Sequence, residues 1–414
     1  MHKLAPLFFL WLGILTSQAQ STYQKDWHQL YTAVQQLPSY REQMKGESKV
    51  AYALGAERLK NVQPTSDFQE FYTLSQLLLP FRDNHLAFYQ NPKQAITKEM
   101  LVDSAWITAY RQSESFLGFP RATLARDSLE AVLQNTAFDQ VEGVYHYESY
   151  LQVGIYRTAR KDSLLGVVLH SRLPHWQPGQ LAFILREFKP DHFRAYHAHL
   201  LQKTFLLVKN EKFIPGRLTE TPWKKESKTP DYVNYSGKVF ELKALSDQVQ
   251  YLHLGSFSTS PQELLKSAAF YDRIKDSLHA PQLIVDLRNN GGGGFKASRK
   301  FLHLLQRYTR RGTVYALVNH RTFSNAEQFA LELRKLKRVT LLGSTTNGTL
   351  TYGNNYGKRM ALPSGKYTLY PTDMKDSGHY QRYEEVGVAP DILLDYNRDW
   401  KEQTLNYIRQ TANR

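Results

Sequence analysis

Apolar segments that alternate with helical segments constrain the fold of residues 235–405 more than any other feature. "PQLIVDL" (281–287), "TVYALVN" (313–319) and "RVTLLG" (338–343) are short apolar runs, which are typical of strands covered on both faces. A further strand is expected at "YLHLGSF" (251–257), and helices are expected from Ser260 and from near Ser324. This order predicts a mostly parallel sheet with flanking helices, in which ligands bind beyond the carboxyl ends of the strands.

The residues before this α/β core predict two other kinds of structure. Residues 20–137 are expected to form a helical domain, because "DWHQLYTAVQQL" and "DFQEFYTLSQLLLPF" carry apolar residues at spacings of three and four. Residues 138–222 are rich in aromatic and branched residues with partial alternation, which predicts a small antiparallel β domain resembling a barrel. The charged, proline-containing run "TPWKKESKTPDY" is expected to be a linker.

The first nineteen residues are expected to be a cleaved signal peptide. Lys3 precedes the apolar run Leu4–Leu15, which is too short to span a bilayer, and Ser17 and Ala19 are placed for cleavage after Ala19. No cysteine follows the cut, so a lipoprotein is not expected, and a chain with no cysteine forms no disulfide. The sequence therefore predicts a periplasmic or secreted protein.

The formal net charge of +15 favours acidic partners, such as an anionic envelope surface, acidic peptides or a peptide carboxylate. Lysine and arginine are scattered along the chain, and an exported protein seldom meets nucleic acid. We therefore expect no nucleic-acid partner and only a weak association with an anionic surface. Nothing in the sequence indicates an oligomeric state.

The four glycines Gly291–Gly294 directly follow one of the buried strands. They could form a phosphate cradle, an oxyanion hole or a tight turn. The spacing matches neither common nucleotide-binding pattern, and four glycines exceed what a turn needs, at an entropic cost. An oxyanion hole is the favoured interpretation.

Ser324 has two compatible interpretations. "SNAE" (324–327) is a capping box, and capping alone explains these four residues. However, a serine where a strand meets a helix also lies beside unpaired N–H groups and the positive end of the helix dipole. Together with the glycine loop of a neighbouring strand, this position makes Ser324 a candidate nucleophile.

Six motifs in order across residues 240–395 carry a family resemblance. The run from "YLHLGSF" through "LIVDLRNNGGGG", "ALVNHRTFSNAEQFALEL", "LLGSTTNGT", "LPSGKYTLYP" and "EEVGVAPDI" resembles the carboxy-terminal-processing, or tail-specific, serine peptidases of family S41. The resemblance implies a crotonase-like or ClpP-like core with Ser324 as nucleophile. It also implies an oxyanion hole formed by the N–H groups of Gly292, Gly293 and Asn325.

One departure from the family pattern indicates the branch. Thr349 stands where the processing branch has a catalytic lysine, and Lys358 is a poor substitute by position. The tricorn-protease-like branch uses a histidine in a D-x-H motif, which "RDNHLAF" matches at His85 with Asn84 before it. That branch places a glutamate before G-V-x-P-D, which implies Glu384, with Glu385 as the alternative.

These observations predict an exported serine endopeptidase that acts on peptide or protein substrates without a cofactor or metal. In this hypothesis His85 is the general base and Glu384 orients it. The alternative is a non-catalytic S41-like protein that binds peptides or apolar ligands in the same cleft, as the missing lysine and the absence of a recognisable PDZ domain suggest. Nucleotide binding is the weakest hypothesis. His192, His197 and His199 could suggest a metal site, but a solvated strand face is expected instead.

Overall fold

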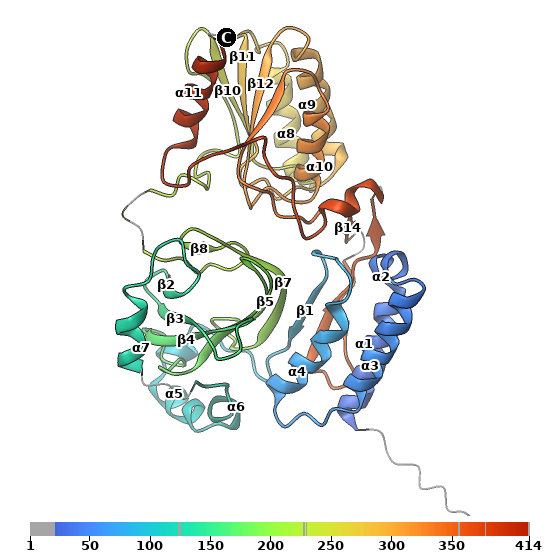
Figure 1. Cartoon of the computed structure of the whole chain (residues 1–414), viewed down its shortest axis with the longest axis vertical. Helices are drawn as coiled ribbons and strands as arrows, with labels where there is room; N and C mark the ends of the chain where they lie inside the picture. Colours follow the sequence, from blue (N-terminus) through green and yellow to red (C-terminus); the bar gives the residue numbers. More distant parts are fainter. Residues whose placement is uncertain are drawn as a thin grey trace, which may run out of the picture.

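The computed structural model describes residues 21–122, 126–226, 228, 230–354, 357–376 and 378–412 (Figure 1). The expected signal peptide lies outside these residues. Among them, every helix is too short or too polar to span a lipid bilayer. An N-terminal group of helices, an antiparallel barrel and an α/β layered core follow one another along the chain.

The predicted N-terminal helices are present. α1 (Thr22–Gln36) begins at a capping box formed by Ser21 and Gln24, and it buries Trp27, Leu30 and Val34 at spacings of three and four residues. The other helices of this region are α2 (Pro38–Gln43), α3 (Glu47–Lys60), α4 (Asp67–Ser75), α5 (Ser104–Arg111), α6 (Glu114–Leu117) and α7 (Arg126–Leu133), with 3₁₀ turns at Gln76–Leu78 and Met100–Val102.

A ten-stranded antiparallel sheet follows the order β15-β16-β1-β7-β6-β5-β4-β3-β2, with β8 paired to β7. Part of it curves into a barrel (Figure 1), and single bridges from Lys224 to His146 and to Arg217 connect β2 to β8. The strands are β1 (Ala87–Gln90), β2 (Gly143–Tyr147), β3 (Leu151–Arg157), β4 (Ser163–Ser171), β5 (Leu181–Lys189), β6 (His192–Ala198), β7 (Phe205–Ile214), β8 (Arg217–Leu218), β15 (Met360–Ala361) and β16 (Tyr367–Tyr370).

Strands distant in the sequence meet at one side of this barrel. β1 pairs with β7 on one edge and with β16 on the other, with Ala87 opposite Tyr370. β15 and β16 fall within the range expected for the α/β core, yet they extend the first sheet. Thus the segment that carries His85 is joined to both later parts of the chain.

The predicted parallel sheet is confirmed. Its order is β18-β13-β12-β11-β10-β9, and every pair is parallel except the edge pair of β10 with β9. Helices α8, α9 and α10 lie on one side of the sheet and α11 on the other (Figure 1). The elements are β9 (Phe240–Ala244), β10 (Val249–Leu254), α8 (Pro261–Ile274), β11 (Gln282–Asp286), α9 (Phe295–Tyr308), β12 (Thr313–Val318), α10 (Asn325–Arg334), β13 (Val339–Gly343), β18 (Ile392–Leu393) and α11 (Trp400–Ala412). A two-stranded ribbon of β14 (Tyr352–Gly353) and β17 (Met374–Lys375) and a 3₁₀ turn, Gly378–Tyr383, complete the chain.

The expectation of a solvated face for the three histidines of β6 and its end is wrong for one of them. His197 is buried, and its Nε2 accepts a hydrogen bond from the indole N–H of Trp223 at 2.8 Å. The barrel interior needs a partner for that buried indole, which explains why a histidine faces inward. The described residues contain no group of three or more histidine and carboxylate side chains that could hold a metal ion.

Candidate functional site

The loops that carry the predicted site residues meet at one edge of the parallel sheet. The glycine loop follows β11, Ser324 follows β12, and the turn 344–349 follows β13. Because these three strands are parallel neighbours, their carboxyl ends lie side by side. This edge faces the barrel (Figure 1).

Ser324 begins α10 in a backbone conformation that differs from those of the other capping serines. Its φ and ψ are 58° and −130°, a region that residues with a side chain rarely adopt. Ser21, Ser66 and Ser260 also cap helices, and all three have the ordinary extended conformation of an N-cap. Such a strained residue costs on the order of 1–3 kcal/mol and persists where the surroundings fix it. Capping alone therefore does not explain the conformation of Ser324.

The glycine loop packs directly against Ser324. Gly292 has a φ of 78°, and a Cβ atom placed there would lie 2.8 Å from the Ser324 Cβ and 2.9 Å from the Asn325 nitrogen. Only glycine allows this approach. The Gly292 N–H donates to Asn290 Oδ1 at 2.9 Å, whereas the N–H groups of Gly293 and Asn325 form no hydrogen bond within the described chain. Two of the three N–H groups predicted to form the oxyanion hole, those of Gly293 and Asn325, thus have no hydrogen-bond acceptor among the described residues.

The buried carboxylate of Glu327 connects the Ser324 elbow to the turn after β13. One oxygen, Oε2, accepts from the N–H of Ser324 at 3.0 Å and from the N–H of Thr349 at 2.8 Å. The other, Oε1, accepts from the Gly348 N–H at 2.7 Å and the Thr346 hydroxyl at 2.5 Å. Burial raises the pKa of Glu327, and the hydrogen bonds from Thr346, Thr349 and Gly348 oppose that effect. The capping box identified Glu327 as a cap partner, but not this wider role.

The segment that carries His85 docks onto the same turn. The side-chain amide of Asn84 donates to the Thr349 hydroxyl at 2.7 Å and to Asn347 Oδ1 at 3.1 Å. Asn347 and Thr349 also bond to each other. Consequently a continuous set of hydrogen bonds runs from Ser324 through Glu327 and Thr349 to the residue before His85. Thr349 occupies the family's lysine position, and Lys358 is exposed.

Of the two candidate glutamates, the structure brings Glu384 to the histidine segment. Its Oε1 accepts from the Asn84 N–H at 2.7 Å, and its Oε2 accepts from the N–H groups of Leu350 and Thr351 at 3.1 and 2.9 Å. Glu385 instead pairs with cations of the barrel. No hydrogen bond joins His85 to Glu384 or to Ser324 within the described residues, and the buried Nδ1 of His85 has no partner.

The pKa values of His85 and Glu384 are both shifted from the values of the free side chains in water. Burial lowers the pKa of His85 to about 4, so its imidazole is neutral and able to accept a proton at neutral pH. Burial, followed by repulsion from Asp83, raises the pKa of Glu384 to about 8, against the three N–H groups that favour its ionised form. Opposite shifts in neighbouring titratable groups are frequent at functional sites.

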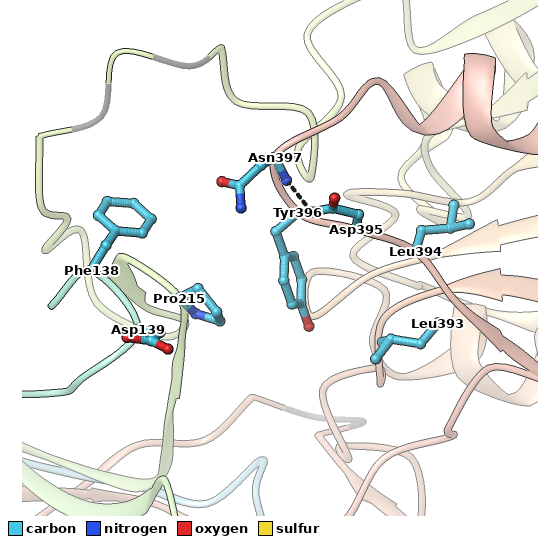
Figure 2. A pocket seen from close by; sticks show the side chains of 8 residues that line it. All are labelled: Phe138, Asp139, Pro215, Leu393, Leu394, Asp395, Tyr396 and Asn397. Atoms are coloured by element: carbon cyan, nitrogen blue, oxygen red, sulfur yellow. Dashed lines mark hydrogen bonds between the residues drawn. The ribbon is translucent and has the colours of Figure 1, made fainter.

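Two pockets of the described chain lie elsewhere. One, of about 510 Å³, is lined by Phe138, Asp139 and Pro215 of the barrel and by residues 393–397, which begin at the last residue of β18 (Figure 2). The second, of about 970 Å³, lies beside α4, α5 and the outer end of β1. Neither is lined by any predicted site residue.

Comparison with known proteins finds a family match within the C-terminal part of the chain. Residues 296–394 match peptidase family S41. The match includes Ser324, Asn325 and Glu384 and leaves out His85, Gly292 and Gly293. This region therefore has the fold of an S41-family peptidase.

Several solved structures are similar over nearly the whole chain. A putative peptidase from Parabacteroides merdae is 14% identical with a TM-score of 0.40, and the match covers 94% of this chain and 96% of that one. Mature CPAF is 10% identical with a TM-score of 0.42, covering 94% and 96%. The photosystem II D1 C-terminal processing protease is 15% identical with a TM-score of 0.35, covering 91% and 94%.

The four hydrogen bonds that Glu327 accepts predict that its replacement lowers the stability of the fold. Glu327→Gln leaves a single acceptor oxygen for four donors, so we expect the free energy of unfolding to fall by about 2–4 kcal/mol. Glu332→Gln on the same helix is the control, because Glu332 pairs at 2.6 Å with the exposed Lys335 and should cost less than about 1 kcal/mol. Denaturant unfolding measures both, and equal losses would contradict the role of Glu327.

Proposed function

We propose that this protein is an exported serine endopeptidase of the tricorn-protease-like branch of S41, with a core of the crotonase-like, ClpP-like type. The observation that carries the proposal is the strained backbone of Ser324, held against Gly292 at the start of a helix. A sharp, strained strand-to-helix turn presents a nucleophilic serine in other hydrolases. The expected signal peptide supports a periplasmic or secreted location.

The proposed reaction divides peptide hydrolysis into two steps. Ser324 Oγ attacks the scissile carbonyl carbon while His85 accepts the hydroxyl proton. When the C–N bond breaks, His85 gives this proton to the leaving amine, and an acyl-enzyme remains. Water then attacks the ester carbon with His85 again as base, which releases the carboxylic acid and restores Ser324. No cofactor is required.

Backbone N–H groups would stabilise the negative oxygen of each tetrahedral intermediate. Gly293 and Asn325 supply unoccupied donors, and the amino end of α10 adds a favourable dipole. Gly292 N–H is held by Asn290, so in this conformation Gly292 contributes mainly the close approach of its backbone. Removing one oxyanion donor typically costs 10²–10³-fold in rate.

Glu384 would hold the histidine segment and stabilise the imidazolium formed during catalysis. In the present conformation its oxygens accept only backbone N–H groups and form no direct bond with His85. The unpartnered Nδ1 of His85 also favours the second hypothesis, a non-catalytic S41-like protein that binds peptides or apolar ligands. The two hypotheses differ in whether Ser324 is reactive.

A fluorophosphonate probe tests the reactivity of Ser324. Wild type should be labelled at Ser324, and Ser324→Ala should not be labelled, because the probe forms a covalent bond only with an activated serine. Ser260→Ala is the matched control, since Ser260 caps α8 with ordinary geometry and should leave labelling unchanged. A folded wild type that resists the probe would favour the binding hypothesis.

The base is tested by replacing His85. We expect His85→Ala to reduce hydrolysis of fluorescent casein and the rate of probe labelling by about 10²–10⁴-fold, because the Ser324 proton then has no acceptor. Thermal unfolding should change little. His279→Ala, at an exposed histidine remote from the site, is the control. Normal rates in His85→Ala would remove His85 from the mechanism.

We also propose a weak association with an anionic envelope surface through α9. No acidic residue occurs between Asp286 and Glu327. Within this run, Lys296, Arg299 and Arg307 lie on one face of α9, Arg310 lies in the turn that follows the helix, and all four are exposed. The described structure pairs none of them with a carboxylate. Lys296 and Arg299 lie in the first turns of α9, where the helix dipole disfavours cations.

Vesicle sedimentation tests this surface. Replacing these four residues with glutamine should abolish binding to phosphatidylglycerol vesicles at low salt, because each cation contributes on the order of 1 kcal/mol at an anionic membrane. The control carries glutamine at the exposed Lys45, Lys49, Arg58 and Lys98, with the same change in net charge. Equal loss in both variants would indicate an effect of net charge rather than of α9.

A further inference from the structure

Lys209 of β7 is a buried cation that connects two segments of the candidate site. Its side chain is 1% exposed. Its Nζ donates to the Phe81 carbonyl at 2.8 Å, in the segment that leads to His85. The same Nζ lies 3.5 Å from Glu385 Oε1, in the turn that carries Glu384. Among the barrel residues, Lys209 therefore holds the histidine and glutamate segments together.

Charged side chains from three different segments surround Lys209. Asp83 lies in the histidine segment, and Glu384 and Glu385 lie in the turn after the 3₁₀ helix. Arg194 of β6 is the other cation, and it pairs with Glu385 Oε2 at 2.9 Å. Three carboxylates thus surround two cations. Arg194 forms a close ion pair with Glu385. Of the three carboxylates, only Glu385 lies within salt-bridge distance of Lys209, and the charges of Asp83 and Glu384 act on Lys209 from farther away.

Burying an amino group is costly unless it neutralises other buried charges. Burial lowers the pKa of Lys209, while Glu385, Asp83 and Glu384 act in the opposite direction. A methionine of similar length would fill the same space without this cost. The charge is therefore better explained by an electrostatic role than by packing.

We propose that Lys209 is a positioning residue that, through Phe81 and Glu385, holds the turn that carries Glu384 beside the His85 segment and favours the ionised form of Glu384. This inference rests on the proposed serine peptidase function and adds a role for the barrel. The barrel is then part of the catalytic apparatus, because one of its strands supplies a cation to the turn that carries the orienting carboxylate.

The pH dependence of fluorophosphonate labelling tests the proposal. If ionised Glu384 is required, the labelling rate rises with pH through a midpoint near the pKa of Glu384, about 8. Lys209→Met removes a nearby cation, disfavours the carboxylate and should move the midpoint upward by roughly one pH unit. Asp83→Asn removes a nearby anion and should move it downward. Lys209→Arg should restore the wild-type midpoint.

Lys225→Met is the matched control for the loss of a buried barrel lysine. Lys225 Nζ donates to the carbonyls of Ala137, Gln140 and Glu142, remote from the site. It should lower stability and leave the midpoint unchanged. If Lys209→Met does not fold, Asp83→Asn and Lys209→Arg still decide the question, since an unmoved midpoint in Asp83→Asn overturns the electrostatic coupling.

The outcomes separate this inference from the proposed function. A wild-type protein that is never labelled overturns both. Labelling of wild type with the same midpoint in Lys209→Met and Lys225→Met overturns the role of Lys209 alone. Opposite shifts in Lys209→Met and Asp83→Asn support it, because loss of stability alone has no reason to move the two midpoints in opposite directions.

Discussion

The buried carboxylate of Glu327 is the interaction on which the rest of the site depends. It is the only group among the described residues that bonds both to the backbone of Ser324 and to the turn 346–349. Without it, the N–H groups of that turn would be buried without partners, at a cost of about 1–3 kcal/mol each. Because Thr349 in turn accepts a hydrogen bond from the Asn84 side chain, Glu327 also supports the position of the histidine segment, although it forms no hydrogen bond with His85 or Glu384.

The strain at Ser324 and the glycine at 292 are two consequences of the same requirement. In the proposed mechanism, the Ser324 hydroxyl and the N–H donors surround one substrate atom, which requires the two loops to approach within contact distance. Gly292 permits that approach, since any side chain would overlap the backbone after Phe323. The conformational cost is offset by α10, whose Ala326, Phe329, Ala330 and Leu333 are buried in the core. Thus the stable part of the fold supports a locally unfavourable conformation.

Local patterns were sufficient to predict the parallel sheet, the N-terminal helices and the barrel strands, because each element has its own periodicity. The contact between the glycine loop and Ser324 also follows, since adjacent parallel strands end at the same edge. Contacts between distant segments could not be predicted in this way. Nothing in "FLLVKNEKFI" distinguishes Lys209, which is buried between carboxylates, from an ordinary strand lysine. Likewise, the inward orientation of His197 depends on the remote Trp223.

The pairing of β1 with β16 shows how residues so far apart in the chain can be held in one register. Ala87 lies opposite Tyr370, so the sheet fixes the backbone just after His85. The Thr372 hydroxyl donates to Asp83 at 2.6 Å, which fixes the backbone just before it. The histidine segment is therefore held on both sides by residues 370–372, and by Asn84 in the middle. A mobile loop would lose conformational entropy each time the site formed, whereas this segment loses it once, during folding. Because β16 and the turn after β13 belong to the same C-terminal part of the chain, this pairing helps to fix the histidine segment relative to Ser324 in the folded protein.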